Sequence, residues 1–557
     1  MGGHVNMMDD VLIANLPPEY LRPALRALLR QGPLVQVPFK EYIQQQLKET
    51  NEPFPPKEAL FPGDDAVSEE CKRFMTMTRC LFSSKLVQEA IPYLSYFITS
   101  LTESGVTWSP SSPLSGTLDT FNGDLVQSMQ ALKETKADFV ASQPLTDLLA
   151  ALASCKAQCS SRGATYPFNR GERQVQDAQA YLFPSSASSS ATGPRQHLQV
   201  SLPTTSRVET FAIGNRQVPR LFVGLWQLSS PQWGSPNAND QERSLSRLVE
   251  NGFVAADMAD HYGDAELVYG DFRLRMPPEV QPAIFAATKW CVFRDIGRAV
   301  TPSWVLAQVE ERCRRLSGRV DLLQFHWYDY GKKEYLDILV ELVKITQSHP
   351  HLVSAIGLCN FNADRTIEAC EYVREKTGSV GIVSNQVQFS IIDSRPLMKM
   401  TGVCEKYNLK LLTYGSYCGG FLANSWANRP APDPYSSNPP LTPSQRKYLE
   451  AIYAWGTWDD FQRLLATLGR AAEKYGVSVA NVAARWVLQQ KSVGAVLVGT
   501  RLGVSGREEE NLNTFGWEIS EEDMAELNVS ILGTGMAKTE KAYQALGDCG
   551  DEYRLGQ

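Results

Sequence analysis

The sequence predicts an α/β fold: a closed (β/α)8 barrel of the TIM type, preceded by a mostly α-helical N-terminal region. From Val208 onwards, eight short apolar runs alternate with amphipathic stretches, the pattern of parallel strands joined by helices. Before residue 180, apolar residues recur instead at helical spacing. An open, doubly wound sheet is the alternative, and it is disfavoured because no predicted strand leads into a Gly-x-Gly-x-x-Gly phosphate loop.

These patterns divide the chain into four parts. Residues 1–180 form a helical region without a catalytic motif, and residues 181–206 form a Ser/Pro-rich flexible linker that contains SSASSSATG at 185–193. Residues 207–540 form the barrel, and residues 541–557 form a C-terminal tail. The first predicted helix carries four leucines on one face: Leu21, Leu25, Leu28 and Leu29.

Composition excludes several classes of protein. The chain has 557 residues and a formal net charge of −7, whereas a nucleic-acid binder usually carries a basic face. No apolar run approaches the length of a membrane-spanning helix, and the N-terminus lacks the basic start and apolar core of a signal peptide. The eleven cysteines form no regular framework, so we expect reduced thiols and a cytoplasmic location. No metal site is expected, because Cys155 and Cys159 are not followed by a second ligand pair.

The elements of the predicted barrel follow in order. The strands are expected at residues 221–224, 253–256, 283–288, 320–325, 353–358, 381–385, 409–413 and 495–499. Amphipathic helices are expected at residues 304–316, 335–345 and 461–475. The second strand runs into a polar turn, after which a helix is expected to begin near Asp264, with acidic residues in its first turn.

Three successive strand ends carry ionisable residues of complementary type. The second strand supplies Asp257 and, on its loop, Tyr262; the third ends in Lys289 and the fourth in His326. The carboxyl ends of barrel strands meet at one mouth, so these side chains are expected to converge there. A lysine cation lowers the pKa of a nearby tyrosine, an aspartate holds the lysine charged, and a histidine positions a carbonyl oxygen or relays a proton. A tyrosine in such a set can protonate a carbonyl oxygen as hydride reaches the carbonyl carbon.

The motifs around these residues resemble those of the aldo-keto reductase superfamily. DMADHYGDAE is similar to its Asp-x-Ala-x-x-Tyr-Gly signature, and AATK and LLQFH are similar to its lysine and histidine motifs. The resemblance runs from about Arg207 to Leu532 and leaves residues 1–200 outside it. It implies that the catalytic tetrad is Asp257, Tyr262, Lys289 and His326, with Tyr262 as the general acid.

The same resemblance implies where a nicotinamide cofactor binds. IGLCNF resembles the family's Gly-Val-Ser-Asn-Phe, with Cys359 in place of the usual serine, so Asn360 carries over as a ligand of the carboxamide. Arg501 and Arg507 fall at the positions that grip the 2′-phosphate, which favours NADPH/NADP over NADH, since guanidinium groups pair bidentately with phosphate. The other expected cofactor-binding residues are Gly224, Leu225, Gln386, Tyr414, Gly499, Glu510 and Asn511.

The resemblance also implies an aromatic substrate pocket lined by Trp226, Trp290 and Trp327, although these indoles would otherwise cap the barrel layers. Cys291 and Cys418 are expected near the same mouth, as inert thiols rather than redox sensors. The expected function is reversible, NADPH-dependent reduction of a small-molecule aldehyde or ketone, without nucleic acid or membrane as a partner. The alternative is a cofactor-sensing adaptor with slow or no turnover, whose helical region binds a protein partner.

Overall fold

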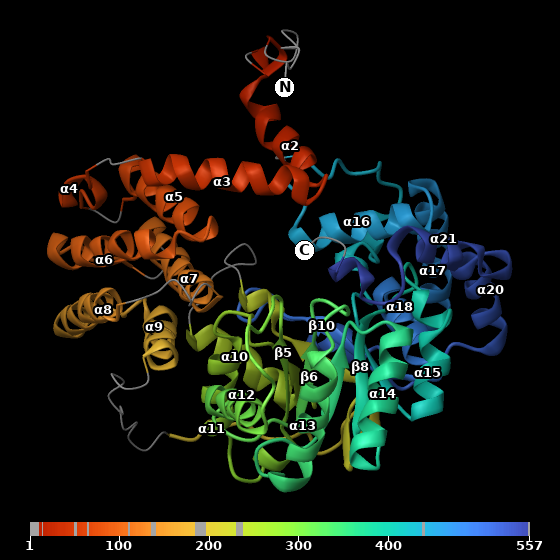
Figure 1. Ribbon diagram of the computed structural model, residues 1–557. Coiled ribbons are helices and arrows are strands. Elements are labelled where there is room, and N and C mark those ends of the chain that lie inside the picture. The colour runs from red at the N-terminus through yellow and green to blue at the C-terminus, as the bar shows by residue number, and fades with distance from the viewer. Residues whose placement is uncertain are drawn as a thin grey trace, which may run out of the picture.

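The computed structural model describes residues 11–13, 15–49, 53–63, 66–109, 112–134, 141–183, 196–229, 238–436 and 440–554. The low-complexity segment predicted at 185–193 lies outside these residues. Within the described chain, no helix is long and apolar enough to cross a membrane. Figure 1 shows a group of helices from the N-terminal part beside a larger α/β body.

The N-terminal part is helical, as predicted. Its core is aromatic and aliphatic: Phe97 of α6 stacks on Phe121 of α7 with ring centroids 3.8 Å apart, and Phe168 meets Phe121 edge-on. Three of the four leucines predicted on the first helix face are exposed, Leu21 and Leu25 at 40% and Leu28 at 54%, whereas Leu29 is half-buried. The helices are α2 (Pro18–Leu29), α3 (Pro33–Glu49), α4 (Lys57–Leu60), α5 (Glu69–Ser83), α6 (Val87–Ser104), α7 (Pro113–Glu134), α8 (Gln143–Ser161) and α9 (Asn169–Leu182).

The C-terminal part is a closed barrel of eight parallel strands, which confirms the predicted fold class. The strands follow one another around the barrel in chain order, and the last pairs with the first. Each predicted strand is present and shifted by only a few residues. They are β3 (Leu221–Gly224), β4 (Ala255–Asp257), β5 (Phe285–Cys291), β6 (Leu322–His326), β7 (Ile356–Cys359), β8 (Ile382–Gln388), β9 (Lys410–Tyr414) and β10 (Val493–Gly499).

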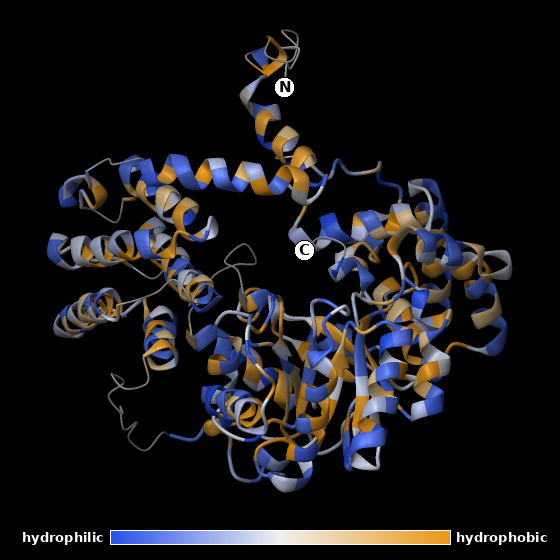
Figure 2. Cartoon of the chain, viewed as in Figure 1, coloured by the Kyte–Doolittle hydropathy of each residue, from blue (hydrophilic) through white to orange (hydrophobic). Residues whose placement is uncertain are grey.

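Helices surround the strands and bury their apolar faces against them. Figure 2 shows hydrophobic residues concentrated on the central strands and hydrophilic residues on the outer faces of the helices. The main outer helices are α10 (Ala238–Glu250), α11 (Ala265–Leu274), α12 (Pro302–Arg315), α13 (Glu334–Ser348), α14 (Ala363–Thr377), α15 (Met400–Tyr407), α17 (Trp458–Tyr475) and α18 (Val479–Leu488). Beyond or between them lie α16 (Pro443–Trp455), α19 (Glu508–Leu512), α20 (Glu521–Leu532) and α21 (Ala537–Leu546).

A hairpin closes the amino-terminal end of the barrel. Its strands β1 (Thr210–Ile213) and β2 (Arg216–Pro219) are antiparallel, and Ile213 belongs to the apolar cluster inside the barrel. Arg216 donates to the Asp321 carboxylate at 2.6 Å, just before β6 begins. With this end plugged, the carboxyl ends of the strands form the only end of the barrel that the hairpin leaves free, and the predicted site lies there.

Candidate active site

The structure brings the four predicted catalytic residues to one mouth. Asp257 ends β4, Lys289 lies near the end of β5, and His326 ends β6. Tyr262 stands on the loop that follows β4, and the Lys289 ammonium lies 4.8 Å from the centre of its ring. Strand order alone explains this meeting, because β4, β5 and β6 are neighbours in the barrel and run parallel.

A buried ion pair forms the base of the site. The Lys289 ammonium donates to the Asp257 carboxylate at 2.5 Å and to the Met258 carbonyl at 2.9 Å. The other Asp257 oxygen accepts from the side-chain amides of Gln324, at 2.7 Å, and Gln386, at 2.8 Å. Burial alone lowers the pKa of Lys289, but the nearby carboxylate outweighs it and holds that pKa above its ordinary value. Lys289 is therefore a permanent cation at neutral pH.

The Tyr262 phenol stays protonated in this environment. Burial raises its pKa, and the Lys289 cation opposes that shift without reversing it. The lowering of this pKa by the lysine was expected from sequence, whereas the larger, opposite effect of burial was not. A protonated phenol next to a fixed cation is a proton donor whose conjugate base the cation stabilises.

His326 is a neutral imidazole with one free nitrogen. Its Nδ1 lies 3.1 Å from the Cys359 carbonyl, which accepts and so fixes the proton on Nδ1. Its Nε2 is buried without a hydrogen-bond partner among the described residues. Burial, assisted by the Arg554 cation, lowers the pKa of His326 to about 3. At neutral pH the free Nε2 therefore accepts hydrogen bonds, and it cannot act as the acid.

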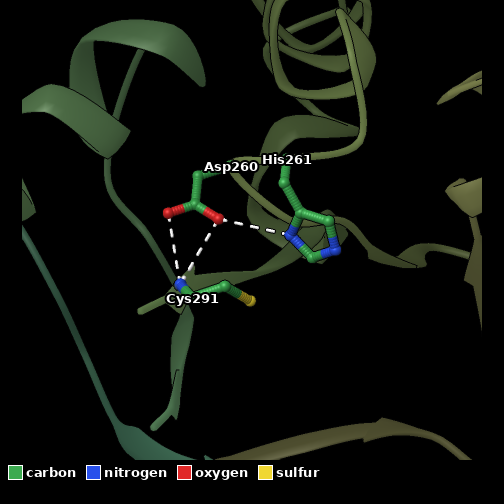
Figure 3. Close-up of side chains that lie close together, drawn as sticks. All are labelled: Asp260, His261 and Cys291. Atoms are coloured by element: carbon green, nitrogen blue, oxygen red, sulfur yellow. Dashed lines mark hydrogen bonds and ion pairs between the residues drawn. The ribbon is translucent and has the colours of Figure 1, made fainter. Parts of the chain in front are cut away.

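A second cluster fastens the tyrosine loop to β5 (Figure 3). Asp260, His261 and Cys291 each offer one atom that could bind a metal ion, and these three atoms lie within 4.8 Å of one another, the spacing of a small metal site. The Asp260 carboxylate, however, already accepts the Cys291 backbone N–H at 3.2 Å and pairs with Arg312 at 2.5 Å. Burial raises the pKa of the Cys291 thiol well above its ordinary value, so a thiolate ligand is disfavoured. We therefore interpret this cluster as a structural fastening.

Three predicted cofactor residues lie together beside the tetrad. Asn360 follows β7 in the left-handed region, at φ 58°, and its backbone N–H donates to the Gln386 carbonyl at 2.8 Å. The Tyr414 hydroxyl, at the end of β9, donates to the Asn360 side-chain oxygen at 2.9 Å. An amide pair and an aromatic ring at adjacent strand ends are suited to holding and stacking a carboxamide-bearing ring.

The other predicted cofactor residues lie at the ends of the two strands that close the barrel. Gly224 and Gly499 are partners in the pairing of β3 with β10, and Leu225 follows directly. Arg501 and Arg507 are exposed on the loop after β10. Arg507 forms an ion pair with Glu510 at 2.9 Å, and the Asn511 backbone N–H donates to the Arg507 carbonyl, also at 2.9 Å.

The tail adds residues at the mouth that the sequence argument missed. The Tyr553 hydroxyl lies 2.9 Å from that of Tyr414, and the Lys447 ammonium donates to it at 2.6 Å. Arg554 donates to the Asn360 carbonyl at 2.6 Å and to the Trp327 carbonyl at 3.1 Å. The tail carries no recognisable motif, and its partners lie more than 100 residues away in the chain, so no local signal could have revealed this role.

Two of the three indoles predicted to line a substrate pocket, Trp290 and Trp327, are buried in contacts with other parts of the barrel. Trp290 packs between β5 and α12, edge-on to Trp304 at 5.4 Å, and the Trp327 indole N–H donates to backbone carbonyls of its own loop. For Trp290 the reason is strand alternation, since the neighbour of the inward-facing Lys289 on β5 points outward, whereas Trp327 follows the last residue of β6 and is held by its own loop. Trp226 remains 40% exposed. The aromatic rings that do face His326 are Phe293, at 5.4 Å, and Tyr553, at 6.2 Å.

The mouth of this closed parallel barrel thus holds a buried Lys–Asp pair, a tyrosine and a histidine nitrogen that has no hydrogen-bond partner among the described residues. The chain belongs to the aldo/keto reductase family, whose model matches residues 220–531. The family's members are oxidoreductases, and the match leaves the N-terminal helices outside it.

The similar proteins include a flagellar protein, an aldo-keto reductase and, among solved structures, a glycerol dehydrogenase. Flagellar radial spoke protein 5 of Chlamydomonas reinhardtii is 28% identical over an alignment of 278 residues, which covers 44% of this chain and about half (51%) of that protein's length. Aldo-keto reductase YhdN of Bacillus subtilis is 23% identical over 336 residues, 57% of this chain and 91% of that protein. Among solved structures, the glycerol dehydrogenase AKR11B4 of Gluconobacter oxydans is 26% identical, with a TM-score of 0.43, over 58% of this chain and 96% of that one.

Proposed function

We propose that this protein reduces an aldehyde or ketone to an alcohol with NADPH, reversibly, and that Tyr262 supplies the proton. The observation that carries the proposal is the buried Lys289–Asp257 pair, whose ammonium lies 4.8 Å from the Tyr262 ring. A cation held in place by a carboxylate stabilises the tyrosinate that forms when the phenol gives up its proton.

The roles of the two candidate acids follow from their protonation states. A neutral His326, with its proton committed to the Cys359 carbonyl, has only a lone pair to offer at Nε2. It therefore accepts a hydrogen bond from the alcohol product or from the Tyr262 hydroxyl and orients it. Tyr262, whose phenol is protonated, is left as the donor to the carbonyl oxygen.

The residues present fit a nicotinamide dinucleotide. When bound, it supplies the hydride that reaches the carbonyl carbon. Asn360 and Gln386 would hold the carboxamide, and Gln386 has its amide N–H groups directed to Asp257 and Gln324, which leaves its oxygen as acceptor. Arg501 and Arg507 are exposed where a 2′-phosphate would lie, which favours NADPH. The substrate would enter between Phe293, which is 44% exposed, and Tyr553.

The test is Tyr262→Phe, which removes one hydroxyl and keeps the ring over Lys289. We expect carbonyl reduction across an aldehyde and ketone panel to fall by about 100-fold or more, because general acid catalysis contributes about that much. NADPH binding, followed by quenching of tryptophan fluorescence, should stay nearly intact. Tyr269→Phe is the matched control, since Tyr269 is a buried tyrosine of α11 outside the mouth. Full activity in Tyr262→Phe would refute the mechanism.

The adaptor role stays a prediction. A pull-down with the full chain, run beside the turnover assay, tests it: a bound partner together with no turnover on the panel would favour the adaptor over the reductase.

A further inference from the structure

Helix α9 of the N-terminal part contacts the loop that carries Tyr262. Arg170, in the first turn of α9, binds the Asp264 carboxylate through two hydrogen bonds, Nε to Oδ2 at 2.9 Å and Nη2 to Oδ1 at 2.7 Å. Arg170 is 6% exposed and Asp264 is fully buried. A bidentate pair sealed from water in this way fixes both distance and orientation between the two elements.

The Asp264 side chain binds Arg170 and does not cap the helix that it precedes. It occupies the N-cap position of α11, where an aspartate usually accepts from the first backbone N–H groups of the helix, but its side chain makes no capping hydrogen bond. One residue earlier, the Gly263 carbonyl accepts from Gln174 of α9 at 3.4 Å and from Arg315 of α12 at 3.2 Å. The two residues that follow Tyr262 are thus both bound by α9.

A second group of buried charges extends the contact towards Lys289. Asp177 of α9 accepts from Lys133 at 2.9 Å and pairs with Arg315. Arg315 also donates to Glu266 at 2.6 Å, and Glu266 accepts from the hydroxyl of Thr288 at 2.5 Å. Thr288 directly precedes Lys289 on β5. These contacts therefore link α9, through Glu266 of α11, to β5, the strand that carries Lys289.

We propose that α9 braces the catalytic mouth, and that Arg170 is a positioning residue for Tyr262. The proposal rests on the proposed reductase function for its catalytic consequence. The first part of the tyrosine loop, residues 258–264, is fastened to β5, since the Met258 and Asp260 backbone N–H groups donate to the Ala287 and Lys289 carbonyls. At Tyr262 itself the backbone N–H donates to the Ala259 carbonyl and the carbonyl accepts from Ala265, both at 3.1 Å, so the bonds from α9 to Gly263 and Asp264 hold the part of the loop that carries the phenol. Removing Arg170 leaves a buried carboxylate without its cation, so the loop has to shift to hydrate it. A displacement of about 1 Å at the acid lowers turnover by up to about 100-fold.

The experiment compares Arg170→Met with Glu172→Gln in the full chain. Glu172 lies on the same helix but pairs with Lys156 inside the N-terminal part, so its substitution perturbs α9 without touching the loop. For Arg170→Met we expect kcat to fall about 10- to 100-fold while the NADPH dissociation constant changes little, because the predicted cofactor residues lie on other strand ends. Arg170→Lys keeps the charge but cannot donate two parallel hydrogen bonds to the carboxylate, so its kcat should lie between those of the parent and Arg170→Met. Glu172→Gln should match the parent.

Hydrogen–deuterium exchange provides a readout that needs no turnover. Arg170→Met should speed exchange in peptides covering residues 258–270, and leave the β6 peptide unchanged. If Arg170→Met does not fold, Gln174→Ala carries the same test, since it removes one hydrogen bond and strands no charge. A folded variant with parental kcat and parental exchange in this segment overturns the brace. A parent that reduces no carbonyl overturns the proposed function instead, while the exchange result still decides whether α9 holds the loop.

Discussion

At the scale of single residues, Asp257 connects the lysine beside the proposed proton donor, Tyr262, with Gln386, a predicted cofactor-binding residue. One oxygen binds the Lys289 ammonium, and the other accepts from Gln324 and Gln386. Gln386 therefore connects the carboxylate beneath Tyr262 to the place predicted for the carboxamide. A change at Asp257 is expected to disturb both proton transfer and cofactor orientation.

Preference for NADPH is expected to depend on two exposed cations. Replacing Arg501 and Arg507 together by alanine should raise the NADPH dissociation constant by about 10- to 100-fold, because a hydrogen bond to a charged group contributes about 1.5–3 kcal/mol. NADH binding should hardly change, since NADH has no 2′-phosphate. Fluorescence titrations with both cofactors measure the ratio.

Arg470→Ala is the matched control for this pair. It removes an exposed arginine of α17 that pairs with Glu526 at 3.2 Å. Equal losses of NADPH and NADH affinity in the double variant would contradict phosphate recognition by these arginines.

Sequence reasoning reached the tetrad because each of its members lies at or just after a strand end, where local pattern and barrel topology suffice. It did not anticipate the burial of Trp290, which follows the inward-facing Lys289 on β5 and so points outward, nor that of Trp327, which its own loop holds after the end of β6. It also missed Tyr553 and Arg554. Their partners Tyr414 and Asn360 lie far away in the chain, and a long-range contact of this kind leaves no local periodicity.

At the scale of elements, the β1–β2 hairpin is expected to stabilise the barrel without taking part in catalysis. Ile213→Ala should lower the free energy of unfolding by about 2–5 kcal/mol, since Ile213 is buried among the strands and its loss leaves a cavity. NADPH affinity should stay at the parental value because the hairpin lies at the opposite end from the tetrad. Urea unfolding and fluorescence titration measure the two quantities.

Thr210→Ala, an exposed position on the same strand, is the control and should change stability by less than about 0.5 kcal/mol. An Ile213→Ala variant as stable as the parent would show that the hairpin is not packed into the barrel.

The predicted elements of the barrel are confirmed because the apolar pattern of a strand or a helix is visible within a short stretch of sequence. The start of α11 is an example: an acidic residue near Asp264 at the helix start was predicted from sequence, but the ion pair of Asp264 with Arg170 was not. Its partner Arg170 is 94 residues away, so a helix-terminus interpretation was the only one that the local sequence supported.

At the scale of the whole molecule, the two parts of the chain meet through charge rather than through a shared apolar core. The apolar cluster of the helices and that of the barrel are separate, whereas Arg170, Asp177, Asp264 and Arg315 are buried between them. Removing one partner of a buried ion pair leaves an uncompensated charge and costs about 3–5 kcal/mol. The junction should accordingly respond to pH more steeply than either core does.

Acid should loosen this junction first. Burial raises the pKa of Asp177 and of Asp264, but their cationic partners outweigh it, so both folded pKa values lie below the ordinary value. Groups of this kind contribute stability that is complete above the unfolded pKa of about 3.9 and is lost as pH falls through the folded value. At pH 3 Asp177 should have lost about 1 kcal/mol of its contribution relative to pH 7, and Asp264 should have lost part of its own. Hydrogen exchange corrected for the intrinsic rate at each pH should therefore accelerate in α9 and in residues 258–270 before it does in β6. An Arg170→Met/Asp264→Asn double variant, which lacks one of the two carboxylates, should show less of this acid sensitivity than the parent. Equal exchange at pH 7 and pH 3 in the parent would contradict a junction held by charge.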